Sequence, residues 1–418
     1  MPRRRRAFRL RKRAAALMGG AVVLFLLGTN VQAGWLFVLS ALLLGTVIAG
    51  AMLPGRMLRG IRIERRAPAE VHQGDEAYVE LVVSNPTRRL RAGIVADDPM
   101  FSPASFEVGT LRPGERVELG AVRVAERRGP QEGGTVTLRS AAPFGVAERR
   151  RSAPAPAPCL VLPKVWPLGA LAFVDAAATT ERALHSAPRR GGGPEFLGVR
   201  EYRSGDSMRH VHWPSTARTG TVMVREFEEE RTRRIAIVVD TVADAGDAWT
   251  PLDACCAAAA SIALAAAADG QGARLLVPGE HEVEVAAHED GRALLRRLGR
   301  LAPSGRSLAD AAPELADALR GAETVVAIAP TWRANAGPTL VPALVTLAAS
   351  GARVVVIPVV LDPEAAGRFA LPPAEADALV ADLRRTGFAT YPWRPGEELA
   401  DALAGRAAAA LDPAGVAP

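Results

Sequence analysis

The sequence predicts a membrane-anchored chain with three kinds of structure: an N-terminal transmembrane helical hairpin, an antiparallel β-sandwich, and an α/β domain on a mostly parallel sheet. Residues 14–53 contain no Lys, Arg, Asp or Glu. Residues 61–151 contain short alternating runs separated by turn signals, and from residue 233 onward apolar strands alternate with helical segments. The 418 residues are enough for several domains, each with its own core.

The apolar run of residues 14–53 is too long for one transmembrane helix, which needs roughly 20 residues, and has the length of two. The polar stretch Thr29–Gly34 interrupts this run. We therefore expect one helix from Ala14 to about Gly28, extended by a few residues, and a second from Trp35 to Leu53. Trp35 fits an aromatic anchor at the membrane interface.

Basic residues flank the hairpin on both sides. Eight lie in residues 1–13 and five in residues 56–66, whereas the turn between the helices carries no charge. The positive-inside rule places both ends, and everything after the second helix, in the cytoplasm. A cleaved signal peptide is disfavoured, because the apolar region is too long and no small-residue cleavage site leads into a polar mature start. We expect a multi-pass protein of the cytoplasmic (inner) membrane whose basic ends bind anionic lipid headgroups.

The basic composition does not indicate nucleic-acid binding. The formal net charge is +6 with a pI near 9.8, but the thirteen basic residues beside the hairpin exceed that net charge. From residue 233 to the end, 23 acidic residues outnumber 16 basic ones, which favours a basic partner there. The three cysteines, Cys159, Cys255 and Cys256, lack metal-binding spacing and exclude a disulfide framework. We expect all three to be small buried residues.

The β module is expected over residues 61–151. Strands are predicted at Ala77–Val83, Arg116–Val124 and Thr135–Arg139, and this density of short strands is typical of an immunoglobulin-like sandwich. Residues 152–192 are expected to form a linker and loop, beginning with the extended spacer SAPAPAP.

Residues 233–418 are predicted to form the α/β domain, because apolar strands alternating with helices indicate a parallel sheet covered on both faces. The expected strands are Arg234–Asp240, Ala273–Val277, His281–Ala286, Thr324–Ala329, Arg353–Leu361 and Phe388–Pro392. The expected helices are Leu252–Ala268, Gly291–Leu301, Leu308–Arg320, Thr339–Ala349, Ala374–Arg385 and Glu398–Leu411.

Residues 193–232, between these domains, crowd charged, aromatic and His side chains into one segment. Its distinctive positions are Glu195, Phe196, Gly198, Arg200, Glu201, Tyr202, Gly205, Asp206, Arg209, Trp213, Ala217 and Arg218. The segment resembles the signature of the bacterial family called domain of unknown function 58, which has the same residues in the same order. The resemblance implies a von Willebrand factor A-like (Rossmann-type) fold for the α/β domain. It also implies partnership with a MoxR-type AAA+ ATPase.

A-type domains often bind a divalent cation through an Asp-x-Ser-x-Ser motif, because carboxylate and hydroxyl oxygens suit a hard cation. Here the corresponding stretch begins at Asp240, but Val242 and Asp244 replace both serines, and Thr331 follows the strand where a further Asp is usual. The sequence therefore predicts a degenerate site at Asp240, Asp244 and Thr331 that holds no metal.

His210 and His212 could converge on zinc, with Asp206 nearby, but a third protein ligand and an HExxH motif are missing from the sequence. A Ser nucleophile, either Ser207 or Ser215, lacks a nucleophile-elbow context. Gly191–Gly193 lacks the Lys-Ser/Thr of a phosphate-binding loop. We expect no catalytic residue and no cofactor.

Two interpretations of the signature stay open. In one, Glu201 and Asp206 pair with nearby Arg residues to lock a loop, with Trp213 packed beneath it. In the other, the segment is a docking face. Its expected partner-binding residues are Glu195, Arg200, Glu201, Tyr202, Asp206, Arg209, His212, Trp213 and Arg218. We expect a non-enzymatic, membrane-anchored adaptor that works with the ATPase in protein maturation or envelope assembly. The alternatives are a metal-dependent hydrolase using Asp206, His210 and His212, or a purely structural membrane protein.

Overall fold

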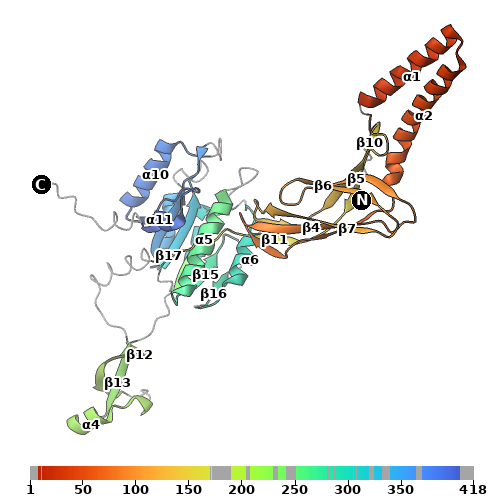
Figure 1. The fold of residues 1–418 in the computed structure, drawn as a ribbon. Helices are drawn as coiled ribbons and strands as arrows, with labels where there is room; N and C mark the ends of the chain where they lie inside the picture. The colour runs from red at the N-terminus through yellow and green to blue at the C-terminus, as the bar shows by residue number, and fades with distance from the viewer. Residues whose placement is uncertain are drawn as a thin grey trace. The chain divides into compact units, whose positions relative to one another are not determined.

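A computed structural model describes most of the chain (Figure 1). It contains two compact units, the first made of residues 1–164 and 298–301 and the second of residues 165–297 and 302–418. The described residues are 8–10, 12–169, 171, 190–203, 208–228, 234–241, 251–279, 282–286, 288–304, 306, 308–319, 324–331, 339–363 and 370–404. Side chains are described for all of these except residues 8–10, 190–198, 209, 226–228 and 234.

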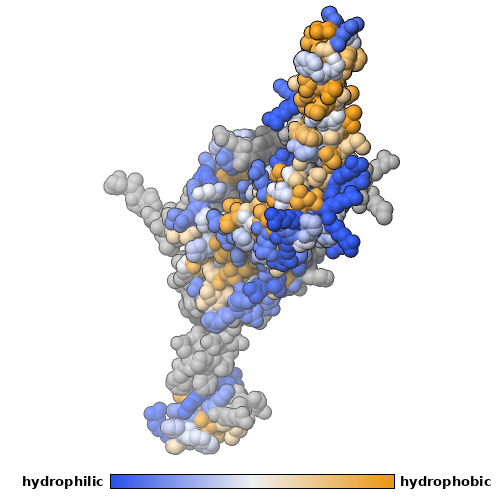
Figure 2. Space-filling model, turned by 45° about the vertical axis from the view of Figure 1, so that its right-hand side comes forward, coloured by the Kyte–Doolittle hydropathy of each residue, from blue (hydrophilic) through white to orange (hydrophobic). Residues whose placement is uncertain are grey.

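Two antiparallel helices, α1 (Lys12–Val31) and α2 (Gly34–Met57), form the N-terminal hairpin. Small residues let them approach closely, and the Ser40 hydroxyl donates across the pair to the Ala21 carbonyl at 2.7 Å. Most of the remaining apolar side chains face outward, as the orange surface of the hairpin shows in Figure 2. Both helices are long and apolar enough to cross a membrane, which indicates membrane anchoring.

The first helix extends a few residues beyond Gly28, as expected, and the turn is confined to Gln32 and Ala33. The hairpin differs from the expectation at its end. The second helix continues past Leu53 with Pro54 inside it. Pro54 has no N–H, so one intrahelical hydrogen bond is missing in the last turns of this helix.

The first unit also contains three antiparallel or mixed sheets. Its strands are β1 (Phe8–Leu10), β2 (Arg62–Arg66), β3 (Glu70–His72), β4 (Glu76–Ser84), β5 (Arg91–Asp98), β6 (Ala104–Leu111), β7 (Arg116–Val124), β8 (Gly129–Gln131), β9 (Thr135–Ser140), β10 (Ala147–Pro154) and β11 (Cys159–Leu162). The sheet orders are β1-β10-β9-β5-β6, β2-β4-β7 and β3-β11-β8. The predicted strands at β4, β7 and β9 are confirmed within one residue.

The five-stranded sheet and the β2-β4-β7 sheet share one apolar core. Alternate residues of β4, such as Leu81 and Val83, meet Ile94 of β5 and Leu138 of β9 in that core. The period-2 pattern of these strands therefore buries one face of each sheet against the other.

The β module extends beyond its expected end at residue 151. Strand β10 continues to Pro154, and β11 pairs parallel with β3 and antiparallel with β8. The Pro-Ala repeat thus lies inside the module rather than in a linker, because Pro at alternate positions leaves the intervening N–H groups free to donate. Two of these, from Ala155 and Ala157, bond to the carbonyls of Gly134 and Glu132.

The second unit contains a six-stranded sheet of order β16-β15-β14-β17-β18-β19. The strands are β14 (Arg234–Val239), β15 (Gly272–Leu276), β16 (Val283–Val285), β17 (Thr324–Pro330), β18 (Arg353–Val359) and β19 (Ala389–Thr390). All pairs are parallel except β15 with β16. The mixed α/β sheet expected from the sequence is confirmed.

Helices cover this sheet on both faces. They are α5 (Pro251–Ala268), α6 (Arg292–Arg300), α7 (Leu308–Ala318), α8 (Leu340–Ala348), α10 (Pro373–Arg385) and α11 (Leu399–Ala404). Helices α7, α8 and α10 share a core with alternate residues of β14, β17 and β18, and α5 contacts the same central strands. The predicted continuation of α11 to Leu411 lies outside the described residues.

Helix α5 is apolar enough to cross a membrane by length and composition, yet 89% of its span is buried within the protein. The sheet lies on one side of it. On another side, Trp166 donates its backbone N–H to the Ser261 hydroxyl at 2.9 Å. The helix is therefore a core helix, and its alanines allow neighbouring segments to pack closely.

Candidate functional site

The signature segment folds as a two-stranded ribbon with a short helix. Strand β12 (Arg190–Glu201) pairs antiparallel with β13 (Met223–Glu228), and Arg200 lies opposite Val224. Between them, η1 (Met208–His210) is a single 3-10 turn and α4 (Trp213–Thr219) is a two-turn helix. Figure 1 labels β12, β13 and α4.

Hydroxyl and imidazole groups fix α4 to the ribbon. His212 precedes the helix, and its Nδ1 lies 2.8 Å from the Ser215 hydroxyl. The Thr216 hydroxyl donates to the His212 carbonyl at 3.1 Å and accepts the Met223 N–H of β13 at 2.9 Å. Gly220 ends the helix with φ of 74°, a left-handed conformation that favours glycine. Two conformationally fixed ends make this short helix a defined element.

The outer surface of this element is apolar and basic. Trp213 is 65% exposed, and Tyr202, Met208 and Val222 are also exposed. Arg218 lies exposed in the last turn of α4. Trp213 therefore does not pack beneath the described part of the segment, contrary to the lock interpretation. We call these five residues the signature face.

The other expected signature residues divide between described and undescribed positions. Arg200 donates to the Glu201 backbone carbonyl at 2.9 Å, and Glu201 is exposed. Glu195 and Arg209 lie in β12 and η1, where only their backbone is described. Asp206 lies outside the described residues, so its predicted pairing with arginine stays a prediction. Met208 and Val222 belong to the signature face but were not singled out by the sequence, since exposure of a lone apolar residue leaves no pattern.

The same geometry bears on the hydrolase alternative. Ser215 is the only candidate nucleophile in the described residues, and it is buried on the inner side of α4. Its hydroxyl lies 2.8 Å from the His212 Nδ1 three residues earlier, which is a local contact between side chains rather than a nucleophile aimed at a cleft. His210 ends the η1 turn and is exposed. Within the described part of the chain, no three His, Cys, Asp or Glu residues gather in a way that could hold a metal.

A second cluster lies where β14 and β17 end, side by side in the sheet. Asp240 and Thr241 follow β14, and Thr331 follows β17; all three are buried. The Thr241 hydroxyl lies 2.9 Å from the hydroxyl of Ser304, and the Thr331 hydroxyl donates to the Val359 carbonyl at 3.1 Å. The crevice beyond the carboxyl ends of such strands, where the strand order reverses, is the usual ligand position in open α/β sheets.

The structure thus brings Asp240 and Thr331 to one edge of the sheet, as expected, whereas Asp244 lies outside the described residues. Thr241 and Ser304 complete the cluster. Ser304 could not be found from sequence spacing, because it comes from a loop more than sixty residues further along the chain. With one carboxylate among the described groups, the cluster has fewer charged ligands than Ca²⁺ or Mg²⁺ sites commonly use.

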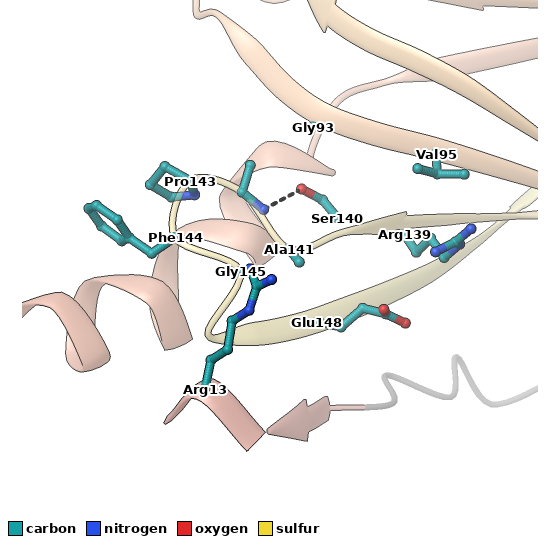
Figure 3. Close-up of a pocket in the computed structure, with 11 residues that line it drawn as sticks. Arg13, Gly93, Val95, Arg139, Ser140, Ala141, Pro143, Phe144, Gly145 and Glu148 are labelled. Carbon is teal, nitrogen blue, oxygen red and sulfur yellow. Dashed lines mark hydrogen bonds between the residues drawn. The ribbon is translucent and has the colours of Figure 1, made fainter. Parts of the chain in front are cut away.

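A third feature is an open pocket in the first unit, beside the start of α1 (Figure 3). It is lined by Arg13 of α1, by strands β5, β9 and β10, and by the loop Ala141–Gly145. Arg139 is held by Asp97 through two contacts of 3.2 and 3.1 Å, and Glu148 pairs with Arg150 at 2.8 Å. Arg13 is the exposed cation of this pocket.

Comparison with protein families gives a match over part of the chain. A family model described as "Protein of unknown function DUF58" matches residues 198–382, which include β13, α4 and most of the α/β sheet. These residues belong to the DUF58 family. The match begins within the signature segment, at Gly198, which agrees with the resemblance found in the sequence.

Other comparisons add little. No curated protein matches the chain. Among solved structures, a β-glucosidase from Listeria innocua in complex with gluconolactone aligns at 15% identity and a TM-score of 0.15, covering 24% of this chain and 16% of that one. A GH20 exo-β-N-acetylglucosaminidase from Vibrio harveyi aligns at 8% identity and a TM-score of 0.20, covering 78% and 60%. The chain spans less than two thirds of either protein, and similarities this low carry no argument.

Proposed function

We propose that this DUF58 protein is a non-enzymatic adaptor, anchored in the cytoplasmic membrane by α1 and α2, that docks a protein partner on its signature face. The observation that carries the proposal is the exposure of Trp213 on a helix whose two ends are fixed by hydrogen bonds and a glycine cap. Exposed aromatic and Arg side chains on a preorganised surface are characteristic of interface hot spots.

The proposed partner is a MoxR-type AAA+ ATPase, as the family resemblance implies, and the shared task is protein maturation or envelope-complex assembly. The proposed orientation follows the positive-inside rule and places the β module and the second unit in the cytoplasm. Two finer fold assignments belong to the same proposal. The β module is taken as immunoglobulin-like, and the α/β unit as von Willebrand factor A-like. One antiparallel edge strand and a ligand position beyond the ends of β14 and β17 would fit the second assignment.

Affinity capture of the full chain from detergent extract tests the partner. We expect an AAA+ ATPase with the unmodified chain and a loss of at least roughly 30-fold in affinity with Trp213→Ala, since a hot-spot tryptophan contributes about 2 kcal/mol or more. Val345→Ala on α8 is a matched control, because Val345 is also an exposed apolar residue. Recovery of no ATPase by the unmodified chain would overturn the partner, and equal loss with both variants would overturn the docking face.

Two further measurements separate this proposal from its alternatives. Elemental analysis of the purified chain distinguishes the hydrolase, because stoichiometric zinc that is lost in His212→Ala would favour metal chemistry over the adaptor. Labelling of Val122→Cys in intact cells with a membrane-impermeant maleimide tests orientation. The three native cysteines are buried, so the introduced thiol on β7 is the reactive one. Labelling before the cells are opened would place the β module outside.

A further inference from the structure

The loop Pro143–Val146 of the β module packs on the side of the helical hairpin. Val146 is fully buried and shares a small core with Ala14 of α1 and Val47 of α2. Gly50 of α2 lies so close that a Cβ at that position would be 2.8 Å from the Val146 Cβ. The loop therefore contacts both helices directly, and the glycine makes the close approach possible.

The position of these contacts along the helices sets the depth of the loop. Gly50 lies roughly 24 Å along α2 from Gly34, and Ala14 lies roughly 26 Å along α1 from Val31, at 1.5 Å per residue. A hydrocarbon core is about 30 Å thick. If the hairpin turn lies at one boundary of the hydrocarbon core, Val146 lies a few ångströms inside the opposite boundary, on the side of the β module. A tilted hairpin, or a turn that protrudes, would place it deeper still.

Phe144 stands two residues before Val146 and is 47% exposed. In Figure 3 its ring points away from the pocket, and the Arg13 side chain reaches toward Gly145 of the same loop. One Arg13 guanidinium nitrogen lies 3.4 Å from the position a Cβ would take at Gly145. Among the described residues Arg13 has no hydrogen-bonding or ionic partner, whereas Arg139 and Glu148 beside it are paired.

We propose that the Pro143–Val146 loop is inserted in the inner lipid interface, with Phe144 among the acyl-chain ends and Arg13 holding the phosphate of an anionic phospholipid. An aromatic ring is stable at this depth, and a guanidinium fork matches two phosphate oxygens. Lipid rather than a protein partner occupies the site, because the loop packs against the transmembrane helices at a depth where lipid surrounds them. The inference rests on the membrane anchoring included in the proposed function.

Depth measurement on the full chain in nanodiscs of phosphatidylglycerol and phosphatidylcholine tests the insertion. A spin label is attached at Phe144→Cys, at Leu42→Cys in the first half of α2, and at Tyr78→Cys on β4; all three positions are exposed. Collision rates with oxygen and with a water-soluble nickel chelate report depth. We expect the oxygen-to-nickel ratio at 144 to be several-fold above that at 78 and below that at 42.

The outcomes distinguish this inference from the proposed function. A label at 144 that is as accessible to nickel as the label at 78, while the label at 42 lies in lipid, overturns the insertion and leaves the anchoring intact. A label at 42 that is itself in water overturns both. Phe144→Ser provides a second variant whose loss of lipid contact would appear as faster hydrogen exchange in residues 141–146.

The phosphate contact is tested separately by native mass spectrometry of the chain released from the same nanodiscs. We expect Arg13→Gln to lose one retained phosphatidylglycerol. Arg66→Gln is the matched control, because it removes the same charge from an exposed position at the far end of β2. Equal retention in the two variants would overturn the role of Arg13. Displacement of the lipid by millimolar inorganic phosphate would identify a free-anion site instead and overturn the lipid assignment.

Discussion

Removal of the Asp98 carboxylate should unfold the β module more readily than any other single change in its charged residues. Asp98 ends β5 and is buried between two arginines from the facing sheet. Arg65 of β2 contacts its two oxygens at 2.5 and 3.2 Å, and Arg123 of β7 contacts it at 3.1 Å. The carboxylate also accepts the Met100 N–H at 3.1 Å. One anion thus joins the two sheets through two buried cations.

The expected magnitude follows from what remains when the anion is removed. Breaking a buried ion pair costs about 3–5 kcal/mol, because the surviving charge has no compensation. In Asp98→Ala two guanidinium groups would remain. Burial already lowers the pKa of Arg123 despite the opposing effect of Asp98, which shows how weakly this cation is solvated. The Arg123 guanidinium carbon lies 5.3 Å from the centroid of the Phe106 ring, and this cation–π contact replaces only part of the stabilisation that water would give the charge.

Peptide-resolved hydrogen exchange on the full chain in detergent measures this cost within the module alone. A loss of about 3–5 kcal/mol corresponds to exchange roughly 100- to 4,000-fold faster for the amides of β4 and β5. Asp97→Ala is the control, since Asp97 is the adjacent residue and its pairing with Arg139 is partly exposed. That pair should contribute about 1 kcal/mol or less. Equal acceleration in the two variants would refute the reasoning.

A triple variant sharpens the test, because it removes the charges together. Replacement of Arg65, Asp98 and Arg123 by apolar residues of similar volume should restore most of the stability lost in Asp98→Ala, since desolvation of the ions offsets much of their attraction. If the triple variant is as unstable as the single one, the cost lies in lost packing or hydrogen bonds rather than in unpaired charge.

Three further outcomes are expected. Burial, with a smaller effect of Glu70, raises the pKa of the Cys159 thiol. The stability that the protonated thiol contributes is therefore complete below about pH 8.5 and is lost as the pH rises through the folded-state pKa. In an iodoacetamide titration, alkylation of the folded chain should lag behind that of the unfolded chain. Gly220→Ala should speed exchange of the α4 amides about fivefold, since a side chain at this left-handed position costs about 1 kcal/mol. Unchanged exchange would show that the glycine cap does not stabilise α4. Arg91→Ala should lower the free energy of opening at the end of α2 by about 1–3 kcal/mol, because the Arg91 guanidinium donates to the Arg56 carbonyl at 2.5 Å. Hydrogen exchange there should be correspondingly faster, and protection equal to that of the unmodified chain would contradict this.

Local signals were sufficient for much of the fold. The uncharged run predicted the hairpin because lipid exposure tolerates few charges, and the alternation in β4 and β7 reflects one buried face. The strands β14, β17 and β18 are continuous apolar runs because helices cover both faces of their sheet.

What the sequence did not reveal depends on partners distant along the chain. Strand β11 has four residues after a Pro-Ala repeat, and only its pairing with β3 and β8 makes it a strand. Ser304 joins the strand-edge cluster through one hydroxyl contact with Thr241. The length and hydropathy of α5 are those of a transmembrane helix, and what decides its place is burial by the sheet and by the segment that contains Trp166 and Leu171.

The junction between the helical hairpin and the β module is held by several contacts. A module that swings relative to the helices would need a flexible connection to them. Instead, Arg91 and Arg151 donate to the Arg56 and Leu58 carbonyls at the carboxyl end of α2, where the backbone carries partial negative charge. Val146 packs against both helices a few turns away, and β1 pairs with β10 just before α1 begins. These four contacts leave the hairpin little freedom to swing. The β module is therefore fixed to the helical hairpin, so in the proposed adaptor any movement on partner binding has to occur outside the first unit.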